Sequence, residues 1–311
     1  MSLYRVPILT NGATHPAAQF RMLIKDLSRG AEGITEGDDL KVTQRATPGG
    51  GITVADGSCV IKGRDDAFQG HYAAYNAGAF NVDIASTGGT GRSDMLIVRV
   101  EDPEYIAGLD PAVDQIVYFQ VISGVSSSAT TIPDGRTGIP LARIDIPAST
   151  ATITDAMITD LRSVANPRRT RQMLTHSPAS DSAVLGASTT FSYFSTEPGV
   201  NILVPDWATK ARIRVDVSPL RYSVNDFFGN LSATFGSSLT LQSTGLDDNQ
   251  GTGIRKIPAI CADTLTVPSA YRGTTQLLRP QANGNSGNLG RINVTTSTTF
   301  VYDVEFEESP R

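Results

Sequence analysis

Three neighbouring stretches decide the fold class: DMLIVRVED at residues 94–102, QIVYFQVIS at 115–123 and PLARIDIPA at 140–148. In the third stretch Arg143 and Asp145 alternate with isoleucines, which is the two-residue period of a strand with one solvated face. In the first, residues 95–98 are continuously apolar, which is typical of a central strand buried on both faces. Together the three predict an antiparallel β-sheet.

The composition agrees with a mainly β protein made of many short strands. Charged residues make up 18% of the 311 residues, and the chain contains 29 glycines and 17 prolines. An average globular domain has roughly 25% charged residues. Glycine and proline recur as turn signals between alternating runs, a pattern typical of sandwiches and barrels.

The length predicts about two domains. We expect an N-terminal β domain over residues 1–165 and a C-terminal β-sandwich, jelly-roll-like, over residues 183–311. Residues 166–182 are polar and contain Pro167 and Pro178, so we expect them to form the linker.

Two segments show helical spacing. In THPAAQFRMLIKDLSRG (14–30), Phe20, Leu23, Ile24 and Leu27 form one apolar stripe, which we expect to pack on a sheet or on a neighbouring subunit. Thr14 can cap this N-terminal helix, and Gly30 suits its end. A second, short interdomain helix is expected within residues 150–165, where Ile153, Met157, Ile158 and Leu161 recur at similar spacing.

Several classes of function have little support in the sequence. The net charge is −5, and one short basic run, Arg168, Arg169 and Arg171, is more typical of a solvated linker than of a nucleic-acid clamp. The three histidines have no metal-ligand spacing, and no nucleophile or phosphate-loop motif is complete. We therefore expect no catalytic residue, no cofactor and no nucleic-acid partner. Cys59 and Cys261 are expected to be two buried free thiols.

The N-terminus shows no secretory signal, and no apolar run is long enough to cross a membrane. We therefore expect synthesis in a bacterial cytoplasm and no membrane insertion.

Three strings carry a resemblance to a known family: TPGGGITVADGSCVIKG (47–63), RSDMLIVRVEDPEY (92–105) and IPLARIDIPASTATITDAMITDLR (139–162). They resemble the minor tail proteins at the tail tip, or baseplate, of siphophages that infect actinobacteria. The resemblance covers about residues 1–165, and in the second half VNILVPDWATKARIRVDV (200–217) is similar to terminal domains of such proteins. It implies a virion protein, often a homotrimer, whose N-terminal domain attaches to other tail-tip proteins and carries a variable C-terminal module.

Aromatic side chains next to amides and carboxylates suggest where a glycan would bind. Sugar rings stack on aromatic faces while polar neighbours bind their hydroxyls. Two clusters fit, HYAAYNAGAF (71–80) and RYSVNDFFGN (221–230), and in each the alternative is core packing. The predicted glycan contacts are Trp207, Tyr222, Asn225 and Asp226, and Trp207 is either an exposed anchor or a lid on the core.

The acidic run LDDNQG (246–251) suggests a calcium site formed by Asp247, Asp248 and Asn249. The distal glutamate and alternating ligands of an EF-hand loop are absent from it, so turn chemistry is the alternative.

Three functions follow. The chain is predicted to be a tail-tip structural protein that also binds the host-cell envelope through a glycan. The first alternative is a purely architectural connector of baseplate or fibre, and the second is a glycan depolymerase, which needs two converging carboxylates.

Overall fold

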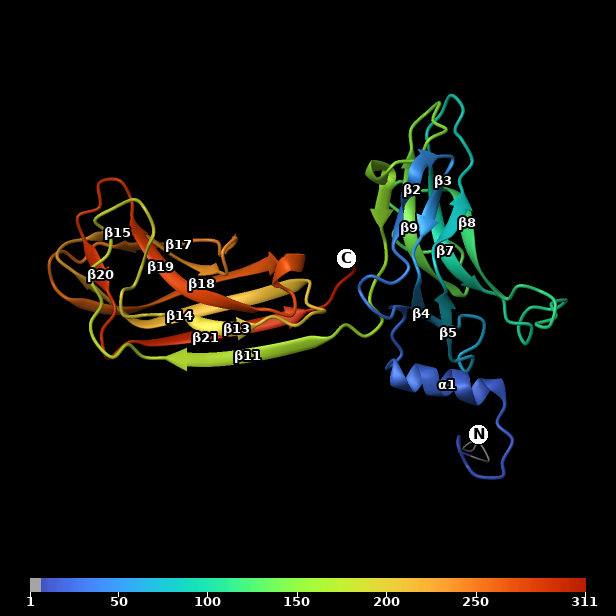
Figure 1. Ribbon diagram of the computed structural model, residues 1–311, viewed down its shortest axis with the longest axis horizontal. Helices are drawn as coiled ribbons and strands as arrows, with labels where there is room; N and C mark the ends of the chain where they lie inside the picture. The colour runs from blue at the N-terminus through green and yellow to red at the C-terminus, as the bar shows by residue number, and fades with distance from the viewer. Residues whose placement is uncertain (1–6) are drawn as a thin grey trace. The chain divides into compact units, whose positions relative to one another are not determined.

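The computed structural model describes residues 7–311, and these form two compact units. The first unit extends to Pro167 and includes Pro310–Arg311, and the second spans Arg168–Ser309. Both consist of antiparallel strands (Figure 1), which confirms the predicted mainly β, sandwich-like fold class.

The first unit contains three sheets. The largest has the strand order β10-β9-β7-β8, and the smaller two have the orders β1-β4-β5 and β2-β3-β6. The strands are β1 (Gly33–Ile34), β2 (Val42–Gly49), β3 (Gly51–Val54), β4 (Gly57–Lys62), β5 (His71–Asn76), β6 (Phe80–Asp83), β7 (Arg92–Val100), β8 (Val117–Val125), β9 (Gly138–Ile146) and β10 (Ile158–Asp160).

The core of the first unit draws apolar side chains from all three sheets. The central strand predicted over residues 95–98 is confirmed, because β7 pairs with β8 on one side and β9 on the other and these four residues are buried. Cys59 of β4 belongs to this core, whereas Cys261 belongs to the core of the second unit. Both are buried free thiols, as predicted.

Helix α1 (Ala17–Leu27) forms where an N-terminal helix was expected, but the predicted Thr14 cap is wrong. Pro16 occupies the N-cap position and makes no side-chain cap. The apolar stripe is only partly covered, since Phe20 and Leu27 are exposed. The buried residue of the helix is Arg21.

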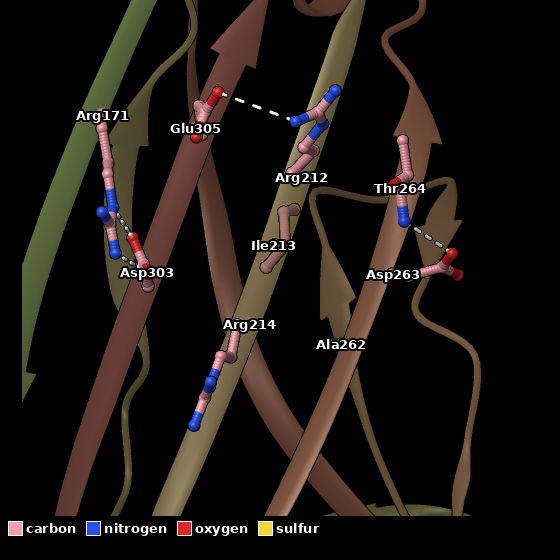
Figure 2. Close-up of a pocket in the computed structure, with 9 residues that line it drawn as sticks. All are labelled: Arg171, Arg212, Ile213, Arg214, Ala262, Asp263, Thr264, Asp303 and Glu305. Atoms are coloured by element: carbon pink, nitrogen blue, oxygen red, sulfur yellow. Dashed lines mark hydrogen bonds and ion pairs between the residues drawn. The ribbon is translucent and has the colours of Figure 1, made fainter.

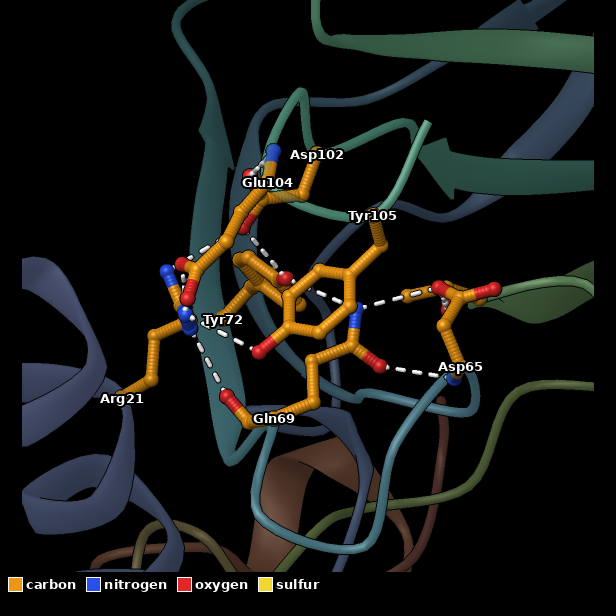
Figure 3. A network of polar contacts seen from close by, with 8 residues as sticks. Arg21, Asp65, Gln69, Tyr72, Asp102, Glu104 and Tyr105 are labelled. Carbon is orange, nitrogen blue, oxygen red and sulfur yellow. Dashed lines mark hydrogen bonds and ion pairs between the residues drawn. The ribbon is translucent and has the colours of Figure 1, made fainter. Parts of the chain in front are cut away.

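Arg21 fastens α1 to the first unit through polar contacts (Figure 3). Its Nε donates to the Gln69 carbonyl at 2.7 Å, and its guanidinium pairs with Asp102 at 3.1 Å and Glu104 at 2.5 Å. The Tyr72 hydroxyl donates to the same Asp102 carboxylate at 2.7 Å. Tyr72 is therefore held inside a structural network.

The second predicted helix, within residues 150–165, is wrong. This segment forms one 3₁₀ turn, Asp155–Met157, and then strand β10, in which Ile158 pairs with Ile144 of β9. The segment contains four threonines, two isoleucines and a valine. Such β-branched side chains favour strands. Pairing with β9 also satisfies backbone groups that would otherwise be exposed on that edge.

The predicted linker over residues 166–182 is also wrong in its first half. Residues 169–176 form strand β11 (Arg169–His176), which pairs along its whole length with β21 (Thr299–Glu307). The basic run lies at the start of this strand, where Arg168, Arg169 and Arg171 form ion pairs with Glu308, Glu307 and Asp303. Those acidic partners lie more than 130 residues away in the sequence.

The second unit is a jelly roll of two packed sheets. One sheet has the order β11-β21-β14-β18, with β20 also on β14; the other has the order β12-β19-β15-β16, with β13 on β19 and β17 on β15. The chain crosses repeatedly between the sheets, which is the double Greek-key order of a jelly roll. The remaining bounds are β12 (Ser192–Tyr193), β13 (Val200–Leu203), β14 (Lys210–Ser223), β15 (Phe227–Phe235), β16 (Leu239–Thr240), β17 (Thr244–Asp248), β18 (Arg255–Thr266), β19 (Thr275–Gly284) and β20 (Arg291–Asn293).

Alternation in β21 explains how the jelly-roll core forms. Phe300, Tyr302, Val304 and Phe306 point inward and are fully buried, while the residues between them face outward. Burying each such side chain contributes about 1.5–3 kcal/mol. A slip of one residue would place acidic side chains in the core, so the register is strongly specified.

Candidate binding surface

The predicted glycan contacts do not form one site, because they lie at opposite ends of the jelly roll. Trp207 precedes β14, whereas Asn225 and Asp226 follow it. A strand as long as β14 spans about 40 Å at about 3.3 Å per residue. Trp207 therefore cannot contact the same small ligand as the other two.

Two of these residues pack in or against the jelly-roll core. Trp207 packs against the jelly-roll core, with the Arg168 guanidinium 5.5 Å from its ring centroid, as expected for a lid. Tyr222 is 3% exposed and makes an edge-on contact with Phe227, with ring centroids 5.8 Å apart. The prediction that Tyr222 contacts a glycan is thus wrong, because its strand position points it into the core.

The three predicted calcium ligands do not converge either. Asp247 and Asp248 are neighbours in β17, so their side chains lie on opposite faces of the strand. Asp247 is exposed, whereas Asp248 is buried and forms an ion pair with Arg255. Asn249 follows in the loop and is exposed. Within residues 7–311, no group of three or more acidic, histidine or cysteine side chains is placed to hold a metal ion.

Asn225 and Asp226 belong to a set of loops at one end of the jelly roll, which we call the loop end: residues 224–226, 249–254 and 285–290. Strand pairing brings these loops together, since Phe227 pairs with Asp248, Tyr222 with Arg255, and Gly229 with Gly284. In Figure 1 they lie where β14 ends and β15 begins.

Arg255 ties two of these loops together from below. Its guanidinium pairs with Asp248 and donates to the carbonyls of Asn225 at 3.3 Å and Gly251 at 2.6 Å. A single side chain therefore fixes the β14–β15 loop against the β17–β18 loop.

Asn288 fixes the third loop in the same way. Its Oδ1 accepts from the Phe228 N–H at 2.8 Å, while its Nδ2 donates to the carbonyls of Gly186 at 2.8 Å and Gly290 at 2.9 Å. The loop end is thus internally hydrogen-bonded, which holds its outward side chains in place.

Apolar side chains are exposed on this framework. Each is at least 49% exposed: Val224, Phe228, Ile254 and Leu289. Val224 also has φ +78°, a conformation that β-branched residues rarely adopt and that is often found at ligand sites. Phe227 is buried and Phe228 is exposed, so the adjacent pair divides between core and surface. Sequence spacing gave no sign of Ile254 or Leu289.

The chain enters and leaves the jelly roll at the other end. Arg169, where β11 begins, pairs with Glu307, where β21 ends, and Lys210 at the start of β14 pairs with the same Glu307. The loop end therefore lies opposite the end at which the chain enters and leaves this unit.

The outward face of the β11-β21-β14-β18 sheet carries paired charges around a shallow hollow (Figure 2). Arg171 hydrogen-bonds Asp303 at 2.5 and 2.7 Å, and this holds the pKa of Asp303 below its ordinary value. Arg214 pairs with Asp216 and Arg212 with Glu307. These arginines are already neutralised, which disfavours phosphate binding on this face.

Comparisons with known proteins assign no family. No protein-family model matches the chain, and no curated protein is significantly similar to it. Among solved structures, the chain is similar to that of the infectious bursal disease virus Gx strain at 12% identity, covering 90% of this chain and 79% of that one, with a TM-score of 0.26. The VP2 subviral particle of the same virus is 12% identical, with 94% of this chain and 86% of that chain covered and a TM-score of 0.24. At such scores, neither fold nor function is inferred from these structures.

Within the described residues, no helix is both long and apolar enough to span a membrane.

Proposed function

We propose that the chain is a structural protein of a phage particle, located at the tail tip, and that it binds the host-cell envelope through the loop end of its jelly roll. The resemblance of residues 1–165 to minor tail proteins motivates the location. The partners would be other tail-tip proteins, itself as a homotrimer, and an envelope glycan.

One observation carries the attachment role. Exposed apolar side chains project from hydrogen-bonded loops at the loop end, opposite the end at which the chain enters and leaves the jelly roll. Exposed apolar groups rimmed by polar residues mark interaction surfaces. Asn225 and Asp226 precede Phe228 in the chain and add an amide and a carboxylate to the loop end. Aromatic faces with polar neighbours are the combination that a sugar ring requires. Several copies on one particle would add weak affinities through effective concentration.

The depolymerase alternative has a specific observation against it. Asp263, Asp303 and Glu305 line the hollow of Figure 2, but Arg171 keeps the pKa of Asp303 low. A glycosidase needs one carboxylic acid with a raised pKa to protonate the leaving group. Asp303 therefore does not fit the role of that acid. We favour a non-enzymatic role. The architectural connector remains the alternative if the loop end is covered by a partner protein.

The test is binding of the full-length protein to cell envelopes from a panel of actinobacteria, with an unrelated bacterium as comparator. We expect saturable binding to a subset of the panel. Leu289→Ser should weaken it, whereas the matched control Leu203→Ser, which alters an exposed leucine on β13, should not. Folded protein that binds no envelope would exclude attachment and support the connector. Equal loss in both variants would remove the loop end as the site.

A further inference from the structure

A second binding feature lies in the first unit, on the strand HYAAYN of the other aromatic cluster. A pocket of about 430 Å³ opens beside β5, β6 and β8. Its lining includes the aromatic side chains Tyr75, Phe80, Tyr118 and Phe119. The volume lies within the range of about 300–1,000 Å³ that is typical of small-molecule sites.

The aromatic rings at the rim of this pocket are exposed. Tyr75 is 81% exposed and Phe80 is 51% exposed. Phe80 lies against Phe119, with ring centroids 5.5 Å apart and planes tilted by 34°. A soluble protein rarely leaves large aromatic faces at a concave site without a ligand for them. These rings form a platform on which a ring-shaped ligand can stack.

The lining of the pocket carries no charged side chain: it consists of Leu40, Cys59, Ala74, Tyr75, Asn76, Phe80, Val98, Gln115, Val117, Tyr118 and Phe119. The Cys59 thiol in the lining also stays neutral, because burial raises its pKa to about 12. A charged ligand would be desolvated here without a counter-charge.

Polar groups in the lining are amides and hydroxyls. The Asn76 Nδ2 donates to the carbonyls of Ala55 and Gly78, which leaves its side-chain oxygen as an acceptor in the lining. The exposed Gln115 amide makes no hydrogen bond with any described residue and offers a donor and an acceptor. Neutral amides bind sugar hydroxyls, and aromatic faces stack on the C–H face of a sugar ring.

We propose that this pocket binds one or two residues of a neutral carbohydrate. The proposal rests on the attachment role and deepens it, since it adds a neutral-glycan site in the first unit to the loop end of the second. Tyr75 and Phe80 stack on the sugar, and Gln115 and Asn76 bind its hydroxyls.

The test uses an array of neutral pentose and hexose oligomers, with sialylated and phosphorylated glycans as charged comparators, followed by calorimetry on the full-length protein. We expect the neutral oligomers to bind in preference to the charged ones. Tyr75→Ala and Phe80→Ala should each weaken binding about tenfold. The matched control is Phe68→Ala, which removes an exposed phenylalanine of the same unit outside the pocket and should bind as the unaltered protein does.

Three results would overturn the proposal. The first is a preference for charged glycans, and the second is full affinity in both pocket variants. The third is that Phe80→Ala dissociates an oligomer, measured by sedimentation without glycan, which would make the pocket a self-association surface. Envelope binding separates this proposal from the broader one. If the pocket variants bind neutral glycans as tightly as the unaltered protein, and Leu289→Ser alone loses envelope binding, the pocket fails and attachment stands. If the unaltered protein binds no envelope yet binds neutral glycans, attachment fails and the pocket stands.

Discussion

Both aromatic clusters place aromatic side chains among small and polar residues, but the structure buries the leading pair of one and exposes that of the other. In the jelly roll, Tyr222 and Phe227 are 3% and 0% exposed and pack against each other in the core. In the first unit, Tyr75 and Phe80 remain largely exposed at the rim of a pocket. The difference is the covering layer: a full second sheet lies over the inner face of β14 and β15, whereas β5 is an edge strand and β6 is four residues long. Aromatic content therefore indicates a site only where the topology leaves one face uncovered.

The largest expected effect tests this contrast directly. Phe227→Ala should cost about 3–5 kcal/mol of the unfolding free energy of the second unit, because it empties a closed core. Phe80→Ala should cost the first unit less than about 1 kcal/mol, because its ring is half exposed. Trp207 is the only tryptophan, so its fluorescence during urea unfolding reports the second unit, and calorimetry reports the first. Equal losses would mean that both clusters are core.

The next effect concerns the framework of the loop end. Arg255→Ala should cost about 3 kcal/mol, because it leaves the buried Asp248 carboxylate without its counter-charge. Adding Asp248→Ala should restore part of that loss, and urea unfolding of the four proteins of this double-mutant cycle measures how much. Simple additivity would show that the pair does not act as a unit.

A smaller, local effect is expected at α1. Arg21→Met removes the ion pairs to Asp102 and Glu104. The free energy of local opening of α1 should therefore fall by about 2 kcal/mol. Hydrogen exchange over residues 17–27 measures this loss. The control is Arg29→Met, at an exposed position after the helix, which should leave the exchange unchanged. Unchanged exchange in Arg21→Met would mean that the partly covered apolar stripe holds the helix instead.

The smallest effect compares one carboxylate in each unit. The pKa values of Asp145 and Asp303 are lowered chiefly by hydrogen bonds from Arg143 and Arg171. A lowered folded-state pKa gives stability that is present above the unfolded pKa, near 3.8, and is lost as the pH falls through the folded pKa. Arg171→Gln should raise the pKa of Asp303 and leave that of Asp145 unchanged, as measured by carboxyl NMR titration between pH 2 and 6, a window of about two units around the ordinary value. A shift at both residues would contradict independent pairs.

Local patterns in the sequence predicted what depends on neighbouring residues. Alternation located β7 and β9, helical spacing located α1, and turn signals indicated a β-sandwich in the second half. They failed where a distant partner decides the outcome. The basic run resembled a solvated linker because its pairing partner, β21, and the acidic residues Glu307, Glu308 and Asp303 lie at the other end of the chain.

The candidate sites were harder to predict for the same reason. Residue type suggested Tyr222 and Trp207, but exposure depends on which strand face a residue occupies and at which end of β14 it lies. Asp247 and Asp248 are adjacent in sequence, and strand alternation separates them. Ile254 and Leu289 have no chemical signature, so only the strand register brings them to the loop end.

The ends of the jelly roll are hydrogen-bonded neighbours. Arg169 pairs with Glu307, and Arg168 forms an ion pair with Glu308, so the unit begins and ends at almost the same point. A unit with adjacent ends can be spliced into a surface turn of another protein without stretching its host. We therefore expect that residues 168–309 can be exchanged as one piece between related proteins, because the strands at the junction keep their pairing.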